Sequence, residues 1–118
     1  MNTPLHNKTC VPCEGGVTPL VADTIQHLLE QVPDWVVRDI SQNGNTIKTL
    51  QKRFQFANFR NAMAFLRQVE DIAESEGHHP DFCVHYNKVD FTIWTHAIGG
   101  LHENDFILAA KIDAIVSK

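Results

Sequence analysis

The turn signal Gln42-Asn43-Gly44-Asn45 constrains the fold more than any other part of this sequence. An Asn-Gly pair tolerates positive φ at both central turn positions, which is the geometry of the two-residue turns that join antiparallel strands. The stretches on either side, residues 35–40 and 47–56, are rich in β-branched and aromatic residues and partly alternate between apolar and polar positions. We therefore expect an antiparallel hairpin here.

A second hairpin is predicted from residues 82–86 and 89–95, with a turn at Asn87-Lys88. In the later strand Val89, Phe91 and Ile93 alternate with polar residues, as in a strand with one buried face. The end of a hairpin's second strand lies beside the start of its first. We therefore expect the chain near His96 to return to the region before residue 82.

Three further stretches have apolar residues at helical spacing. The first is residues 18–31, with Thr18 as its cap and Pro19 at its first position. The second runs from an Asn58 cap to Glu76 and is ended by Gly77, and the third covers about residues 103–116. The predicted core positions are Val21, Ile25, Leu28 and Leu29; Phe59, Ala62, Met63, Phe65, Leu66, Val69, Ile72 and Ala73; and Leu101, Leu108, Ile112 and Ile115 or Val116.

The element order α-β-β-α-β-β-α predicts an α+β fold, a four-stranded antiparallel sheet with three helices on one face. The helices need a sheet face or each other to bury their apolar stripes. At 118 residues the chain has the length of one domain, which we place at residues 18–118. Residues 1–17 have scattered Pro, Gly and Asn and no periodicity, so we expect a flexible N-terminal arm.

Composition narrows the function classes. Hydrophobic residues make up 43% of the chain and charged residues 20%, which is typical of a soluble globular protein. The formal charge of −4 gives no basic surface for direct nucleic-acid binding. The sequence shows no membrane span and no signal peptide, so we expect a cytoplasmic protein.

The three cysteines form no disulfide framework, because their number is odd. Cys10 and Cys13 make a CxxC in the predicted arm, which supplies half a zinc site without a second pair, and glycines follow where a thioredoxin-like motif needs a helix. Cys83 stands alone in a predicted strand. Reduced thiols on a flexible arm are the simplest interpretation of the CxxC.

The functional hypothesis from the sequence rests on three histidines. His78-His79 precede Pro80, which fixes its own φ and disfavours helix at His79, so the pair should lie at a helix exit. The second hairpin would bring His96 beside them. Imidazole titrates near neutral pH, so three gathered rings predict a proton-transfer site. Two alternatives remain: solvated surface histidines, or a metal site, for which the sequence has no HxxxH or HxH pair.

Trp94 shares the more polar face of its predicted strand with His96. An exposed indole beside Thr and His would offer a surface on which a flat ring could stack. A subunit contact made by the same Trp is the alternative.

A set of motifs resembles the pterin-4a-carbinolamine dehydratase family, also known as the dimerization cofactor of a homeodomain transcription factor. The set comprises His78-His79-Pro80, Tyr86-Asn87-Lys88-Val89, Thr95-His96, Gly100-Leu101 and Asp105, with Trp35 and the aromatic segment Phe54 to Phe59 upstream. The resemblance covers roughly residues 20–118. The CxPCxGG leader is similar to leaders on some bacterial members, where it is not catalytic.

The resemblance implies a dehydratase that converts 4a-hydroxytetrahydropterin to quinonoid dihydropterin and so recycles the cofactor of aromatic amino-acid hydroxylases, phenylalanine hydroxylase among them. No metal and no cofactor is implied, and the protein would be a homodimer or homotetramer. The catalytic residues carried over are His78, His79 and His96, with acid and base unassigned. The substrate-binding positions carried over are Gly77, Pro80, Trp35, Trp94, Thr95, Ala97 and Asp105, the last placed to orient a histidine.

Two positions depart from the family's pattern. Gly77 stands where an acidic residue is frequent, and His102 stands where Ser or Thr usually caps the last helix, which puts the start of that helix in doubt. The competing hypotheses are a non-catalytic binding module or transcriptional coactivator acting through its oligomer helices, and an unrelated metal-binding protein using the histidines with Cys83.

Overall fold

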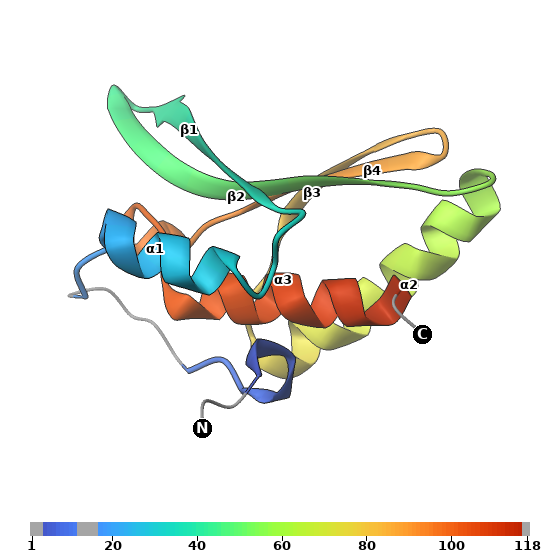
Figure 1. Cartoon of the computed structure of the whole chain (residues 1–118). Helices are drawn as coiled ribbons and strands as arrows, with labels where there is room; N and C mark the ends of the chain where they lie inside the picture. Colours follow the sequence, from blue (N-terminus) through green and yellow to red (C-terminus); the bar gives the residue numbers. More distant parts are fainter. Residues whose placement is uncertain (1–3, 12–16, 117–118) are drawn as a thin grey trace.

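The computed structural model describes residues 4–11 and 17–116. It is an α+β structure in which a four-stranded antiparallel sheet is covered on one side by helices (Figure 1). The helices are α1 (Ala22–Leu29), α2 (Phe59–Glu76) and α3 (Glu103–Val116), and the strands are β1 (Val36–Gln42), β2 (Asn45–Gln55), β3 (Asp81–His85) and β4 (Lys88–Ile93). The predicted fold class and element order are confirmed.

The sheet has the strand order β1-β2-β4-β3, so the two hairpins lie side by side with β2 and β4 in the centre. The first hairpin turns at Asn43 and Gly44, whose φ angles of 52° and 81° are those that the Asn-Gly signal predicts. The second turns one residue earlier than predicted. Tyr86 adopts φ 56° and Lys88 is already in β4, because Asn87 makes two hydrogen bonds with the backbone of Phe56, the residue that follows β2.

The predicted strand 89–95 is too long at its end. β4 stops at Ile93, and the N–H of Thr95 donates to the carbonyl of Gly100 at 2.9 Å. The chain therefore closes a loop on itself, and His96 begins a 3-10 helix, η2 (His96–Ile98), instead of ending a strand.

Helix α2 has the predicted ends. The Asn58 side chain accepts from the N–H of Asn61 at 2.8 Å, and Gly77 ends the helix in the left-handed conformation with φ 65°. The predicted apolar stripe is right except for Phe59 in the first turn, which is exposed.

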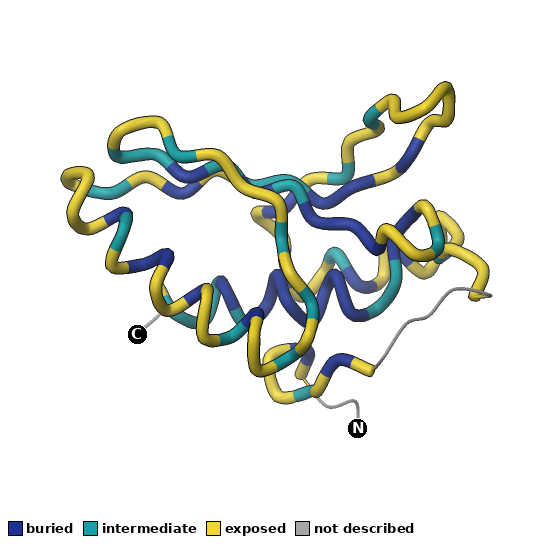
Figure 2. Tube along the Cα trace, turned by 180° about the vertical axis from the view of Figure 1, so that it is seen from behind, coloured by how far each residue is buried: buried dark blue, intermediate teal, exposed yellow. Residues whose placement is uncertain are grey.

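Helix α3 lies beneath the sheet and is the most buried of the described helices (Figure 2). Its predicted core positions Leu108 and Ile112 are buried. Of the two alternatives for the last core position, Ile115 is partly buried against the core and Val116 is exposed. The spacing argument missed how completely the helix is enclosed. The further buried residues are Asn104, Asp105, Phe106, Ile107, Ala109 and Ala110.

Helix α1 begins later than predicted, and Thr18 and Pro19 do not start it. The N–H of Leu20 donates to the carbonyl of Leu101 at 2.9 Å, and Pro19 packs so closely on Gly100 that an added Cβ there would lie 2.8 Å from it. Because this segment is tied to the loop before α3, the helix starts at Ala22. Val21 becomes the cap residue and is exposed, so it is not the core position we expected.

Of the N-terminal arm expected from the sequence, the structure describes residues 4–11 and 17. Residues 4–11 run along α3 and contain a short 3-10 helix, η1 (Leu5–Asn7), whose Leu5 is fully buried. Cys10 is buried as well, whereas Cys13, the second cysteine of the CxxC, lies outside the described residues. Among the helices described, none is both long and apolar enough to cross a membrane.

Candidate active site

A pocket of about 360 Å³ opens where the end of α2, the start of β3 and the loop after β4 meet. His78, His79 and His96 all line it, so the geometry expected from the second hairpin is present. Five of the carried-over substrate positions also line it: Gly77, Pro80, Trp94, Thr95 and Ala97.

The backbone around the histidine pair explains its position. Gly77 takes the left-handed conformation that ends α2, and the N–H groups of Gly77 and His78 both donate to the carbonyl of Ala73. A side chain at Gly77 would meet no neighbouring atom, so its conformation is what requires glycine. Pro80 then directs the chain into β3. An acidic residue at position 77 would adopt this backbone only with strain.

His78 is held by a buried carboxylate. Its Nε2 lies 2.6 Å from Oδ1 of Asp105, whose side chain is 0% exposed. The second oxygen, Oδ2, accepts from the hydroxyl of Thr95 at 2.9 Å and from the N–H of His102 at 2.8 Å. A carboxylate can only accept hydrogen bonds, so His78 carries a hydrogen on Nε2 and the lone pair of the neutral ring is on Nδ1.

His102 caps α3, which resolves the departure noted at this position. Its Nδ1 accepts from the N–H of Asn104 at 2.9 Å, while the carboxylate of Asp105 accepts from the N–H of His102. This reciprocal pair has the arrangement of a capping box, with imidazole in place of the usual hydroxyl. Asp105 therefore starts the helix and orients His78 with the same side chain.

His79 and His96 are held more loosely than His78. Their side chains are 61% and 59% exposed, against 14% for His78. His79 Nε2 lies 2.5 Å from Oε2 of Glu74, and His96 Nε2 lies 3.7 Å from Oδ2 of Asp81. Each of the three rings therefore has a carboxylate neighbour.

Trp94 is not the exposed platform we expected. It is 7% exposed, because β4 ends before it and its ring turns into the core cluster. One face of the indole stacks on the His96 ring, with centroids 3.8 Å apart and planes 16° from parallel. Trp94 thus supports His96.

Trp35 lies outside this pocket. It is buried under the sheet against Phe54 and Phe91, and its Nε1 donates to Asp113 at 3.0 Å. The sequence analysis also missed three lining residues: Val11 from the N-terminal segment, Asp81 at the start of β3 and Asn104 from α3. No periodicity marked Val11, and nothing distinguished Asn104 from a surface residue of the predicted helix.

Within residues 4–11 and 17–116, no group of three or more His, Cys, Asp or Glu side chains is arranged to hold a metal ion together. Cys83, which we considered as a ligand with the histidines, is on an edge strand and is not among the residues that line the pocket.

Sequence comparison extends the resemblance to nearly the whole chain. A protein of Halorhodospira halophila is 45% identical over 111 residues, which cover 94% of this chain and 96% of that protein. One from Rubrobacter xylanophilus is 41% identical over 111 residues, covering 94% and 97%. Both names give pterin-4-alpha-carbinolamine dehydratase as a provisional assignment.

A crystal structure from Brucella melitensis, described as a transcriptional coactivator/pterin dehydratase, is similar in fold and sequence. Its TM-score is 0.70 at 30% identity, and the match covers 83% of this chain and 98% of that one. The family model described as pterin 4 alpha carbinolamine dehydratase matches residues 18–115. The chain therefore belongs to the pterin 4 alpha carbinolamine dehydratase family.

Proposed function

We propose that this protein dehydrates a 4a-hydroxytetrahydropterin to the quinonoid dihydropterin by histidine acid-base catalysis. The observation that carries the proposal is the meeting of His78, His79 and His96 in one pocket, with His78 fixed by the buried Asp105. Family membership supplies the substrate class.

The reaction suits such a site. The bond between C4a and the hydroxyl oxygen breaks, the oxygen leaves as water after taking a proton, and the N5 proton is lost to a base. Each positioned proton transfer accelerates a reaction by roughly 10²–10⁴-fold. Imidazole serves as acid and as base near neutral pH, since its unperturbed pKa is about 6.5.

The three histidines differ in how far their contacts fix the tautomer and position of the ring. Asp105 fixes the tautomer of His78, which makes Nδ1 the basic nitrogen of that ring. His79 and His96 are in contact with solvent and with carboxylates, so either ring can exchange protons with water between turnovers. A division of labour in which His78 is held and the two others exchange protons is consistent with these contacts.

The test is stopped-flow measurement of the loss of 4a-carbinolamine with purified protein. Alanine variants at His78, His79 and His96 should each slow the reaction while circular dichroism stays unchanged. The His79 and His96 changes combined should cost less than the product of their separate effects, because residues acting as one unit are not additive. Three folded variants with the original rate would refute the catalytic proposal.

Self-association is part of this proposal and has its own test. Edge strands β1 and β3 each have one side that pairs with no other strand among the described residues, and an apolar groove of about 440 Å³ runs between α2 and β3. It is lined by Met63, Leu66, Val69, Phe82 and Val84 among others. We expect a homodimer or homotetramer, and a 13.3 kDa particle in light scattering at micromolar concentration would contradict it.

A further inference from the structure

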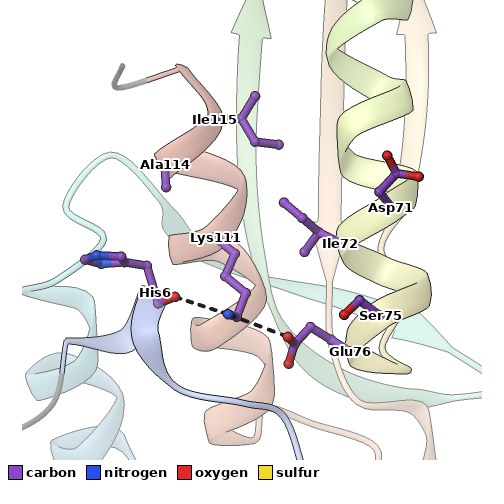
Figure 3. Close-up of a pocket in the computed structure, with 8 residues that line it drawn as sticks. All are labelled: His6, Asp71, Ile72, Ser75, Glu76, Lys111, Ala114 and Ile115. Atoms are coloured by element: carbon purple, nitrogen blue, oxygen red, sulfur yellow. Dashed lines mark hydrogen bonds and ion pairs between the residues drawn. The ribbon is translucent and has the colours of Figure 1, made fainter.

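The described N-terminal segment is bound to the domain along its whole length. The buried Leu5 donates its N–H to the Gln31 side chain at 3.0 Å. Lys111 then reaches from α3 to the carbonyl of His6 at 3.1 Å and to Glu76 of α2 at 3.5 Å, so it links two helices to the segment (Figure 3). These contacts bring the chain over the start of α3.

Cys10 continues this attachment close to the histidine pocket. Its N–H donates to Oε1 of Glu76 at 2.7 Å, and its thiol lies 3.6 Å from the carbonyl of Asn104. Burial, reinforced by the Glu76 carboxylate, raises the pKa of the Cys10 thiol to about 12. The thiol is therefore neutral and enclosed for as long as the segment stays docked.

The last described residue of the segment, Val11, is paired with one side chain. The N–H of Val11 donates to Oδ1 of Asn104 at 3.0 Å, and Nδ2 of Asn104 donates to the carbonyl of Val11 at 2.6 Å. Asn104 is 2% exposed, so the amide has no competing water on this side. The neighbour of Asn104 in α3 is Asp105, which holds His78.

These two hydrogen bonds fix the apolar side chain of Val11 at the histidine pocket. Val11 is 57% exposed although its backbone is bound on both sides, and it lines the pocket with the three histidines. Exposed valine has no structural need for such anchoring, whereas a wall for a ligand does. Binding sites gain affinity from apolar contacts that are already in position.

We propose that Val11 is a substrate-contacting residue that forms an apolar wall of the pterin site, and that Asn104 is the positioning residue that holds it there. The inference rests on the proposed function for the identity of the ligand. Val11 cannot transfer a proton, and both polar atoms of the Asn104 amide are engaged by Val11. The pair therefore acts on binding of the pterin and not on the proton-transfer steps.

The experiment uses the full chain with Val11→Ser, Val11→Ile, Asn104→Ala and the control Val116→Ser, which makes the same change at an exposed residue at the end of α3. Steady-state dehydration gives kcat and KM. Alkylation of Cys10 by iodoacetamide, followed by peptide mass spectrometry, reports whether the segment is docked. Circular dichroism checks the fold.

Val11→Ser should raise KM about fivefold with kcat within about twofold, since part of a valine side chain's burial is lost, and Cys10 should stay protected. Val11→Ile should keep the original KM. Asn104→Ala should expose Cys10 to alkylation and raise KM at least as much as Val11→Ser. Val116→Ser should leave KM, kcat and Cys10 alkylation unchanged.

An active protein in which Val11→Ser keeps the original KM would overturn the inference and leave the dehydratase proposal intact. So would an Asn104→Ala variant whose Cys10 is exposed while KM is unchanged. A wild-type chain without dehydratase activity would instead refute the proposed function. The proposed contact between Val11 and the pterin would then be tested by fluorescence titration with 7,8-dihydropterin. Equal affinity of wild type and Val11→Ser, or no binding to either, would overturn the inference.

Discussion

Replacing Asp105 with Asn tests whether this buried carboxylate sets the chemistry of the site. The side chain accepts from three donors at once: His78, Thr95 and the N–H of His102. An amide of the same shape has one acceptor oxygen and one NH₂ group, so one of the two oxygen positions must become a donor.

The two orientations of the amide are not equal in free energy. With NH₂ at the Oδ2 position it faces the N–H of His102, a main-chain donor that cannot turn into an acceptor, and an unsatisfied buried donor costs about 1–3 kcal/mol. With NH₂ at the Oδ1 position it faces only the His78 ring, which can move its hydrogen from Nε2 to Nδ1. The second orientation should win, so the lone pair of His78 moves to the wrong nitrogen.

We therefore expect Asp105→Asn to lose about a hundredfold or more in kcat, the usual range for one misplaced proton transfer. Loss of a charged acceptor should lower the free energy of unfolding by about 2 kcal/mol. For a domain of this size that corresponds to a Tm lower by about 8 °C. Stopped-flow dehydration gives the rate, thermal denaturation gives the stability, and nitrogen-detected NMR of the imidazole gives the tautomer. A folded variant with the original rate, or with hydrogen still on Nε2 of His78, would refute the argument.

Two further outcomes follow from the contacts around the pocket. Gly77→Ala should lower the free energy of unfolding by about 1 kcal/mol, because the left-handed φ of 65° strains any side chain although none would clash there, and a thermal melt equal to wild type would contradict this. In the native protein at pH 8, iodoacetamide should modify the exposed Cys83 well before Cys10, and peptide mapping that finds equal rates would show that the N-terminal segment is not docked. Because burial raises the pKa of Cys10 from 9.0 to about 12, the unfolded chain ionises first, so stability from this thiol should fall as pH rises from 9 toward 12.

Local chemistry explains why most of the fold could be predicted. Asn43-Gly44, the Asn58 cap and the Gly77 helix end each satisfy backbone requirements within a few residues, so their signals do not depend on the rest of the molecule. The alternation in β4 was also reliable, because every second residue there faces the helices.

The errors occurred where distant segments decide the outcome. Thr18 and Pro19 are a plausible helix start, yet the N–H of Leu20 finds the carbonyl of Leu101, more than 80 residues away, and the helix begins later. The alternation of β4 does not extend to Trp94, because the strand ends at Ile93, and the Trp94 side chain is buried. Neither the hydrogen bond from Leu20 to Leu101 nor the end of β4 at Ile93 can be predicted from the spacing of neighbouring residues.

The same division applies to the candidate site. The adjacency of the pair to Pro80 and the return of the second hairpin were enough to predict that the three histidines meet. Val11, in contrast, lines the pocket because the N-terminal segment is held by residues far along the chain, Asn104 among them. Asp105 was placed near a histidine by the resemblance. Its second role at the start of α3, where it accepts from the N–H of His102, became visible only in the structure.

One turn of helix α3 joins the parts of this site that come from different regions of the chain. Asp105 binds His78 from the end of α2 and Thr95 from the loop after β4, while its neighbour Asn104 binds Val11 from the N-terminal segment. Helix α3 is itself the most buried of the described helices, so packing restrains the backbone that presents these side chains. His79 and His96, by contrast, are exposed and lie outside this anchor. Under the proposed function, this arrangement would keep the His78 ring in one orientation and leave His79 and His96 in contact with the water that their proton transfers require.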